Sequence, residues 1–205
     1  MLSLSYLFEA ERVFWDNVYK KDEAHWVDKK VSNLTKYACK KYGPFKNVLE
    51  IGCAAGIDTF YIAQYTTNQV IGIDIAEKAI QLAKQNLEKQ PKNIQKKVRF
   101  EVGNVEDLRF PKNYFDFIYS LSVLHSTDID KSFKEIHRVI TNNGKAVIYV
   151  YLEEEEHKRS YSQADFEEIS GKYFNILKTS IRNIPKDAGG DTHKALILEL
   201  QAKKY

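Results

Sequence analysis

The chain has 205 residues, of which 43% are hydrophobic and 29% charged, and its formal net charge is +3 at pH 7. This length suits one domain with a sizeable core and is short for two. No apolar run is long enough to cross a bilayer, and acidic residues near the N-terminus argue against a secretory signal. Two cysteines, Cys39 and Cys53, are too few for a disulfide framework or a zinc site, so we expect a cytoplasmic protein.

The first 44 residues are expected to form a helical cap. Apolar residues recur at helical spacing from Leu4 to Val18, and the aromatic residues of this segment include Trp15 and Tyr19. A second helix is predicted to end at Gly43-Pro44. Its apolar stripe consists of Val27, Val31, Leu34 and Ala38.

From residue 45 the pattern alternates between short apolar runs and amphipathic stretches. Strands are predicted at residues 47–51, 69–74, 97–102, 115–120 and 144–151. Helices are predicted at residues 57–65, 76–90 and 129–141. Apolar strands separated by amphipathic helices are typical of βαβ units and of a parallel sheet that is buried on both faces.

The rhythm changes after residue 160. Ser162, followed by Asp165 three residues later, predicts the start of a helix that runs to Gly171. Strands are expected at residues 173–182 and 194–201, and no helix separates them, so this pair is predicted to be antiparallel. We therefore expect one domain over residues 1–205, with the cap at 1–44 and an α/β core at 45–205.

The turn after the first predicted strand consists of small residues. The strand Val48–Ile51 runs directly into Gly52-Cys53-Ala54-Ala55-Gly56. Ligands of open parallel sheets bind beyond the carboxyl ends of the strands, where glycines let the backbone approach a ligand closely. A helix that begins just after the turn adds the positive end of its dipole. The sequence therefore predicts that this turn binds a ligand.

Two common nucleotide-binding patterns fit this turn poorly. Dinucleotide enzymes use G-x-G-x-x-G, whereas Gly52 and Gly56 form G-x-x-x-G, which disfavours a nicotinamide-dependent dehydrogenase. A P-loop needs Gly-Lys followed by Ser or Thr, and neither Gly144-Lys145 nor Gly171-Lys172 continues in that way. The turn is better suited to a ligand with an adenosine and an amino-acid moiety.

The second predicted strand ends in a matching acid. The run "VIGID" places Asp74 22 residues after Gly52, close to the usual offset of a ribose-binding carboxylate. A carboxylate only accepts hydrogen bonds and can take both ribose hydroxyls. Ile75 beside it is a candidate to pack on an adenine face.

Four stretches together resemble the class I S-adenosylmethionine-dependent methyltransferases. "VLEIGCAAG" and "VIGIDIAEKAI" look like motif I and the acidic motif that follows it. "VGNVEDLRFPKNYFDFIYSLSVLHS" and "EIHRVITNNGKAVIYV" follow in family order and spacing. The resemblance covers about residues 45–150 and points to the small-molecule branch of ubiquinone- and menaquinone-biosynthesis enzymes. It implies a Rossmann-like methyltransferase sheet of about seven strands, mostly parallel with the last strand antiparallel, and helices on both faces.

The resemblance implies S-adenosyl-L-methionine as cofactor and assigns residues to its parts. Glu50 would position the turn and the methionine end of the cofactor. Gly52, Cys53 and Gly56 would lie along the methionine and ribose. Asp74 would hold the ribose hydroxyls.

The remaining assignments concern adenine and the ammonium group. Asn104 and Val105 would face the adenine, and Ser120 and Leu121 would offer backbone carbonyls to the ammonium group. The chain departs from the family where Ala54 replaces the usual glycine, which affects how closely the backbone approaches the ligand. It departs again at Asn104, where Asp is common, although Asn still presents an acceptor to the exocyclic amine.

Methyl transfer from a sulfonium is an in-line displacement, so the protein aligns the acceptor and excludes water. The stretch "SLSVLHS" lacks the Asn-Pro-Pro-Tyr pattern of enzymes that methylate adenine bases or glutamine. Neither Cys39 nor Cys53 is placed for cytosine C5 methylation. These absences disfavour base methylation of those two kinds.

Two histidines are candidate general bases. His125 follows the fourth strand, and histidine is a side chain whose ordinary pKa suits a general base. The alternative is a histidine that caps the next helix or packs against it. His193, with Asp191, lies in the loop between the last two strands, for which a plain surface hairpin is the alternative. Trp15 and Tyr19 are candidate substrate contacts, and core packing is their alternative.

The sequence thus predicts an S-adenosylmethionine-dependent methyltransferase that acts on a small-molecule acceptor by direct in-line transfer, without metal or membrane. An RNA methyltransferase using the Lys-rich residues 84–99 is one alternative, although nucleic acid is not the expected partner. A non-catalytic S-adenosylmethionine-binding protein and an α/β domain whose turn binds nothing are two others.

Overall fold

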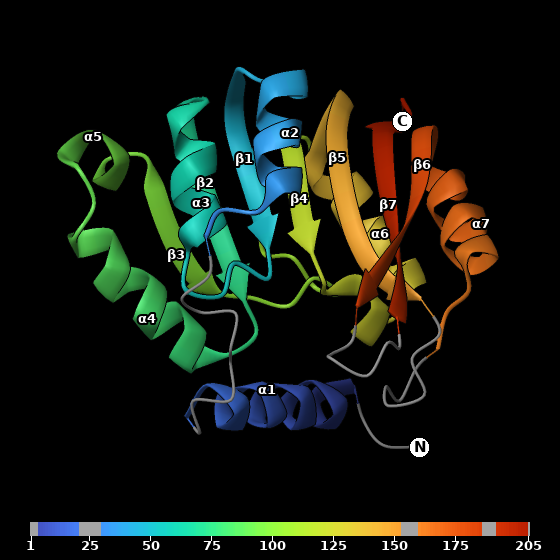
Figure 1. Cartoon of the computed structure of the whole chain (residues 1–205), viewed down its shortest axis with the longest axis horizontal. Coiled ribbons are helices and arrows are strands. Elements are labelled where there is room, and N and C mark those ends of the chain that lie inside the picture. Colours follow the sequence, from blue (N-terminus) through green and yellow to red (C-terminus); the bar gives the residue numbers. More distant parts are fainter. Residues whose placement is uncertain (1–3, 21–29, 153–159, 186–191, 205) are drawn as a thin grey trace. The chain divides into compact units, whose positions relative to one another are not determined.

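The computed structural model describes residues 4–20, 30–152, 160–185 and 192–204 (Figure 1). The chain divides into two compact units, Met1–Asn104 and Val105–Tyr205. Among the described residues, no helix is long and apolar enough to cross a membrane.

The first unit contains three parallel strands in the order β3-β2-β1, together with five helices among its described residues. Glu50 of β1 lies opposite Gly72 of β2, and Asp74 of β2 lies opposite Val102 of β3. The predicted core strands and helices are confirmed here, with ends that differ by at most three residues. The elements are α1 (Leu4–Lys20), α2 (Asn33–Tyr42), β1 (Phe45–Ile51), α3 (Ile57–Gln64), β2 (Thr66–Asp74), α4 (Glu77–Glu88), α5 (Lys92–Gln95) and β3 (Val98–Val102).

Helix α2 begins later than the apolar stripe suggests. The side chain of Ser32 accepts a hydrogen bond from the Leu34 amide at 3.1 Å and caps the helix. A capping serine satisfies a helix donor that has no partner within the helix, so it sets the first turn. Val31 therefore precedes α2, and the prediction that it belongs to the helical stripe is wrong. Val27 lies outside the described residues.

The second unit contains four strands in the order β4-β5-β7-β6. β4 and β5 are parallel, and β7 lies between β5 and β6 and is antiparallel to both. The antiparallel pairing of the last two strands is confirmed, as is the sheet of seven strands. The elements are β4 (Phe115–Leu121), η1 (Leu124–Ser126), α6 (Ile129–Val139), β5 (Ile140–Leu152), α7 (Gln163–Tyr173), β6 (Phe174–Pro185) and β7 (Thr192–Ala202).

The hairpin between β6 and β7 is longer than predicted and its loop is shorter. Asn183 pairs with Lys194, and Ile184 pairs with His193, in a stretch expected to be loop. Each further antiparallel pair adds main-chain hydrogen bonds, and Pro185 sits at a strand end, where its missing N–H is tolerated. Residues 186–191, including Asp191, lie outside the described residues.

Parallel strands with both faces covered explain the apolar runs. Val48, Leu49 and Val70 are fully buried in the first unit. In the second unit, Phe117 and Tyr119 of β4 are equally buried. Polar side chains are therefore conspicuous where they interrupt these strands, as Glu50 and Asp74 do.

Candidate cofactor site

The turn after β1 contains three residues in the left-handed backbone region. Gly52 has φ 76°, Ala54 has φ 47° and Gly56 has φ 85°. The amides of Gly52 and Cys53 both donate to the carbonyl of Ile73, at 2.8 and 2.9 Å. The turn is thus tied to the end of β2, and α3 begins immediately after it.

Ala54 adopts a conformation that costs an L-residue about 1–2 kcal/mol relative to glycine. The sequence suggests only that its methyl group affects the approach of a ligand. The structure adds a backbone reason for glycine at this position. The Ala54 amide donates to Asp74 Oδ2 at 3.0 Å, so the strained residue is fixed by the acid of the neighbouring strand.

Phe100 of β3 supports the turn. A Cβ atom on Gly56 would lie 2.6 Å from the Phe100 ring, and one on Gly72 would lie 2.8 Å from the same ring. Phe60 packs edge-to-face against Phe100 at a centroid distance of 5.7 Å. Cys53 is buried, and its Cβ atom would lie 2.9 Å from a Cβ atom on Gly72, so its side chain belongs to this packing.

Asp74 lies at the carboxyl end of β2 and is buried. Its Oδ2 accepts from the Ala54 amide and its Oδ1 accepts from the Ala76 amide, each at 3.0 Å. Burial raises the pKa of Asp74 from 3.8 to about 6, although these amides oppose the shift. Each carboxylate oxygen has a second lone pair, so the group retains acceptor capacity for ligand hydroxyls.

Glu50 is buried at the end of β1 and accepts a hydrogen bond from the hydroxyl of Thr59 in α3. Burial, the nearby Asp58 carboxylate and, more weakly, Asp74 raise its pKa well above the usual range. No described lysine or arginine lies within ion-pair distance of Glu50 or Asp74.

Two further polar residues near the turn, Asp58 and Thr59, were not identified in the sequence analysis. Asp58 accepts from the Ser32 amide at 2.9 Å, so the start of α3 is connected to the start of α2. Burial raises the pKa of Asp58, while this hydrogen bond and one with Thr35 oppose the shift. Asp58 and Thr59 are adjacent polar residues in the otherwise apolar start of α3, and this interruption is the sequence feature that could have identified them.

Helix α1 packs on α4 and beside the turn after β1. Tyr19 is buried against Ala76 and Ala79, and Trp15 and Ala54 border this cluster. The core-packing alternative for the two aromatic residues is therefore observed, and their contact with a substrate remains a prediction.

In the second unit, β4 ends with the buried Ser120 and the half-buried Leu121. The next residue, Ser122, has φ 60°, and its amide donates to the carbonyl of Tyr149 at 2.9 Å. The chain therefore bends sharply away from the strand. Val105, at the start of this unit, is buried, and Asn104, the last residue of the first unit, is half-buried. Contacts of these residues with a cofactor remain predictions.

His125 is buried in η1 and contacts the ring of Tyr151 edge-on, at a centroid distance of 5.3 Å. Asp128 caps α6 by accepting from the Lys131 amide at 3.2 Å, so His125 does not cap that helix. The alternatives of packing and catalysis remain. His193 lies in β7, but its side chain is outside the described residues.

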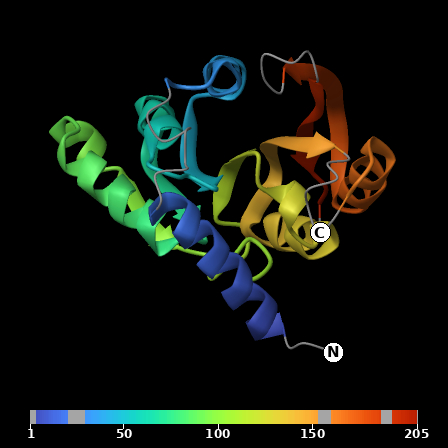
Figure 2. The ribbon, with the colours of Figure 1, turned by 60° about the horizontal axis from the view of Figure 1, so that its bottom comes forward.

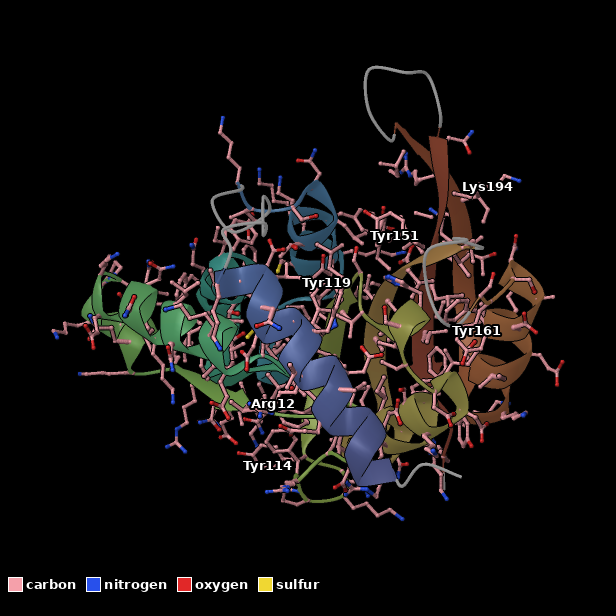
Figure 3. The ribbon with its side chains drawn as sticks, turned by 90° about the horizontal axis from the view of Figure 1, so that it is seen from below. Arg12, Tyr114, Tyr119, Tyr151, Tyr161 and Lys194 are labelled. Carbon is pink, nitrogen blue, oxygen red and sulfur yellow. The ribbon has the colours of Figure 1, made fainter. Side chains whose placement is uncertain are left out.

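A hydrogen-bond network fixes the segment that follows His125. The Thr127 hydroxyl contacts the Leu124 carbonyl at 2.9 Å and the buried Ser132 hydroxyl at 2.8 Å. The Tyr161 hydroxyl donates to the Thr127 carbonyl at 3.0 Å; Tyr151 and Tyr161 are labelled in Figure 3. Thr127 and Tyr161 were not identified from the sequence.

Part of the chain is similar to known methyltransferases. Residues 49–148 match a methyltransferase domain. Sterol 24-C-methyltransferase of Pneumocystis carinii is 31% identical over 108 residues, which are 52% of this chain and 28% of the relative. Phosphoethanolamine N-methyltransferase 1 of Zea mays is 30% identical over 146 residues, 71% of this chain and 27% of the relative. The chain therefore spans about a quarter of the length of these curated relatives.

A solved structure has the same fold. Phosphoethanolamine N-methyltransferase 2 of Haemonchus contortus, in complex with phosphomonomethylethanolamine and S-adenosylhomocysteine, has a TM-score of 0.68 at 19% identity. The match covers 84% of this chain and 53% of that one. A methyltransferase domain thus matches residues 49–148 of the chain, and the glycine turn and the acid at the end of β2 lie within that stretch.

Proposed function

We propose that the chain transfers a methyl group from S-adenosylmethionine to a small-molecule acceptor. The observation that carries this proposal is the hydrogen bond from the Ala54 amide to Asp74, which joins the glycine turn and the acid that we propose to bind the ribose. The two features that the cofactor requires are therefore held at one edge of the first unit. The names of the relatives, which include sterol and phosphoethanolamine methyltransferases, favour a small molecule as acceptor.

When bound, the cofactor supplies an electrophilic methyl group on a sulfonium, and the chain provides binding and orientation. Asp74 would accept the ribose hydroxyls, Ile75 would pack on the adenine, and the left-handed turn would allow close backbone approach. Glu50, which is hydrogen-bonded to the Thr59 hydroxyl, would position the turn and the methionine end of the cofactor. His125, where the acceptor carries an O–H or N–H, would accept the proton that is released.

We propose no nucleic-acid partner. The lysines between residues 84 and 99 include several with local roles in the first unit. Lys92 Nζ donates to Gln95 at 3.1 Å, and Lys97 Nζ donates to the Thr66 carbonyl at 2.6 Å. These contacts are typical of a solvated helix face and its adjoining loop. We further propose a cytoplasmic location, which is supported by two free and buried cysteines, Cys39 and Cys53.

The first test is calorimetric titration with S-adenosylmethionine and S-adenosylhomocysteine, with NADH as a control. We expect micromolar binding of both sulfur compounds, at least tenfold weaker binding in Asp74→Ala, and none of NADH. A radiolabelled-methyl assay against amines, phosphoethanolamine, sterols, quinols and RNA then identifies the acceptor. The cofactor proposal would be overturned by no binding of either sulfur compound. Binding without transfer to any acceptor would favour a non-catalytic role.

A further inference from the structure

Helix α4 is capped by a residue from another helix. Its N-cap residue, Ala76, has no side chain able to cap. Instead, Oδ1 of Asp16 in α1 accepts from the Lys78 amide at 3.0 Å, across 62 residues of sequence. Asp16 is buried, so solvent competes little for this bond. Figure 2 shows α1 beside the first turn of α4.

The Lys78 amide, which donates to Asp16, lies in the same first turn of α4 as the Ala76 amide, which donates to Asp74. Asp74 accepts from the Ala76 amide, and Asp16 accepts from the Lys78 amide two residues later. Two carboxylates from different elements thus hold neighbouring amides of one helix start. Ile75, the candidate adenine contact, lies directly beside Ala76.

Other contacts fix α1 in this place. Arg12 Nη1 donates to Asp16 Oδ2 at 3.3 Å and to Glu77 Oε1 at 3.1 Å, and Arg12 is labelled in Figure 3. Tyr19 packs on Ala76 and Ala79. The cap is therefore part of a contact with both polar and apolar components, and α1 has a defined rotation on α4.

We propose that Asp16 is a positioning residue for the cofactor site, because its carboxylate caps α4 and so holds Asp74 and Ile75 in place to receive the adenosine. This inference rests on the proposed function. Asp16 does not reach the reacting atoms and acts through the first turn of α4. Loss of a capping oxygen typically changes the affected equilibrium fivefold to tenfold.

Charge distinguishes this role from simple packing. The ionisable groups around Asp74 are Asp16 and Arg12 of α1, Glu50 of β1, Cys53 of the turn, and Glu77 and Lys78 at the start of α4. Asp16 adds to the effect of burial in raising the pKa of Asp74. Asp16→Asn keeps an acceptor for the Lys78 amide but removes the charge. It is therefore expected to lower the pKa of Asp74 and to preserve the cap.

The test compares Asp16→Ala, Asp16→Asn and the control Glu9→Ala in the full-length protein. Glu9 is an exposed partner of Arg12 on the same helix and does not contact α4 in the described contacts. Two quantities are measured: the dissociation constant for S-adenosylmethionine from pH 5 to 8, and hydrogen exchange of the Lys78 amide without cofactor.

For Asp16→Ala we expect about tenfold faster exchange at Lys78 and fivefold to tenfold weaker cofactor binding at pH 7. Asp16→Asn should bind as the wild type does at pH 7, and its loss of affinity in acid should begin at lower pH. Glu9→Ala should match the wild type in both measurements.

If hydrogen exchange of the Lys78 amide is unchanged in Asp16→Ala, the conclusion that Asp16 caps α4 is overturned. Faster exchange with unchanged cofactor affinity would overturn the positioning role and leave Asp16 purely structural. A wild-type protein that fails to bind the cofactor would overturn the proposed function, and the positioning role with it, while the exchange data would still report on the cap.

Discussion

Two turns in the molecule follow buried parallel strands, and they are held in different ways. The turn after β1 is fixed by backbone amides that donate to the Ile73 carbonyl and to Asp74. The turn after β4 begins at the left-handed Ser122, whose amide donates to the Tyr149 carbonyl, and the residues beyond it are held in addition by the side chains of Thr127 and Tyr161. The first turn therefore depends mainly on restricted backbone angles and amides, whereas the segment after β4 also depends on side chains whose type can vary.

The largest expected effect comes from breaking the first turn at Gly56. Gly56→Ala would place a Cβ atom 2.6 Å from the buried Phe100 ring in a residue with φ 85°. We expect a loss of about 3 kcal/mol in the free energy of unfolding, from overpacking and left-handed strain together.

The matched control for Gly56→Ala is Gly171→Ala in α7. No atom lies within 4 Å of the added Cβ there, so we expect a gain of about 0.5–1 kcal/mol from helix propensity. Urea unfolding measures both changes. Equal destabilisation by the two variants would show that the contact with Phe100 is not the cause.

The second prediction concerns pH and the first turn only. Because burial raises the pKa of Asp74 to about 6 and the ribose requires the ionised form, cofactor affinity should fall about tenfold between pH 7 and pH 5. The free protein responds in the opposite sense. The contribution of Asp74 to the free energy of unfolding is greatest below pH 4. It is lost as the pH rises through 6, since the folded state holds the Asp74 proton more tightly than the unfolded state does.

Calorimetry at the two pH values measures the affinity, and urea unfolding without ligand measures the stability. Asp74→Asn should bind more weakly at pH 7 and lose most of the pH dependence. A wild-type affinity that is equal at pH 5 and pH 7 would contradict the requirement for ionised Asp74.

The third prediction tests the second turn through Tyr161. Tyr161→Phe removes the hydroxyl that donates to the Thr127 carbonyl. We expect about 1 kcal/mol of destabilisation, unchanged cofactor affinity and a methyl-transfer rate lowered several-fold. Tyr37→Phe, which removes a phenol that accepts from Lys41 on the surface, is the control and should change none of these. Weaker cofactor binding in Tyr161→Phe would contradict the separation of the two turns.

The smallest effects are expected from glycine at the left-handed residues. Ala54→Gly and Ser122→Gly each relieve strain but increase the entropy of the unfolded chain. Each variant should therefore gain less than about 1 kcal/mol in the free energy of unfolding. Only Ala54→Gly should also change the affinity for S-adenosylmethionine. Thermal unfolding and calorimetry measure the two quantities, and an equal change of affinity in both variants would remove the distinction.

The difference between the turns explains what could be predicted from the sequence. Gly52, Gly56 and Asp74 were recognisable because the backbone angles, and the strand end that each occupies, restrict the residue type. Asp16 was missed because its partner, the Lys78 amide, is 62 residues away and leaves no local pattern. Tyr161 was missed because its partner, the Thr127 carbonyl, is 34 residues away. The Thr127 hydroxyl bonds to nearby residues, but these bonds leave no distinctive sequence pattern. Val31 was assigned to a helix because its spacing fits, although the Ser32 cap decides the helix start.

The cap on α4 has a consequence for the order in which the protein forms. Helix α1 leaves the ribosome before α4, and the Lys78 amide that donates to Asp16 is synthesised 62 residues after it. Loop closure over such a distance is slow compared with local helix formation. We therefore expect α1 to dock after β1, β2 and α4 have assembled. Within the first unit, α1 would therefore be synthesised before β1, β2 and α4 but would reach its final position after them.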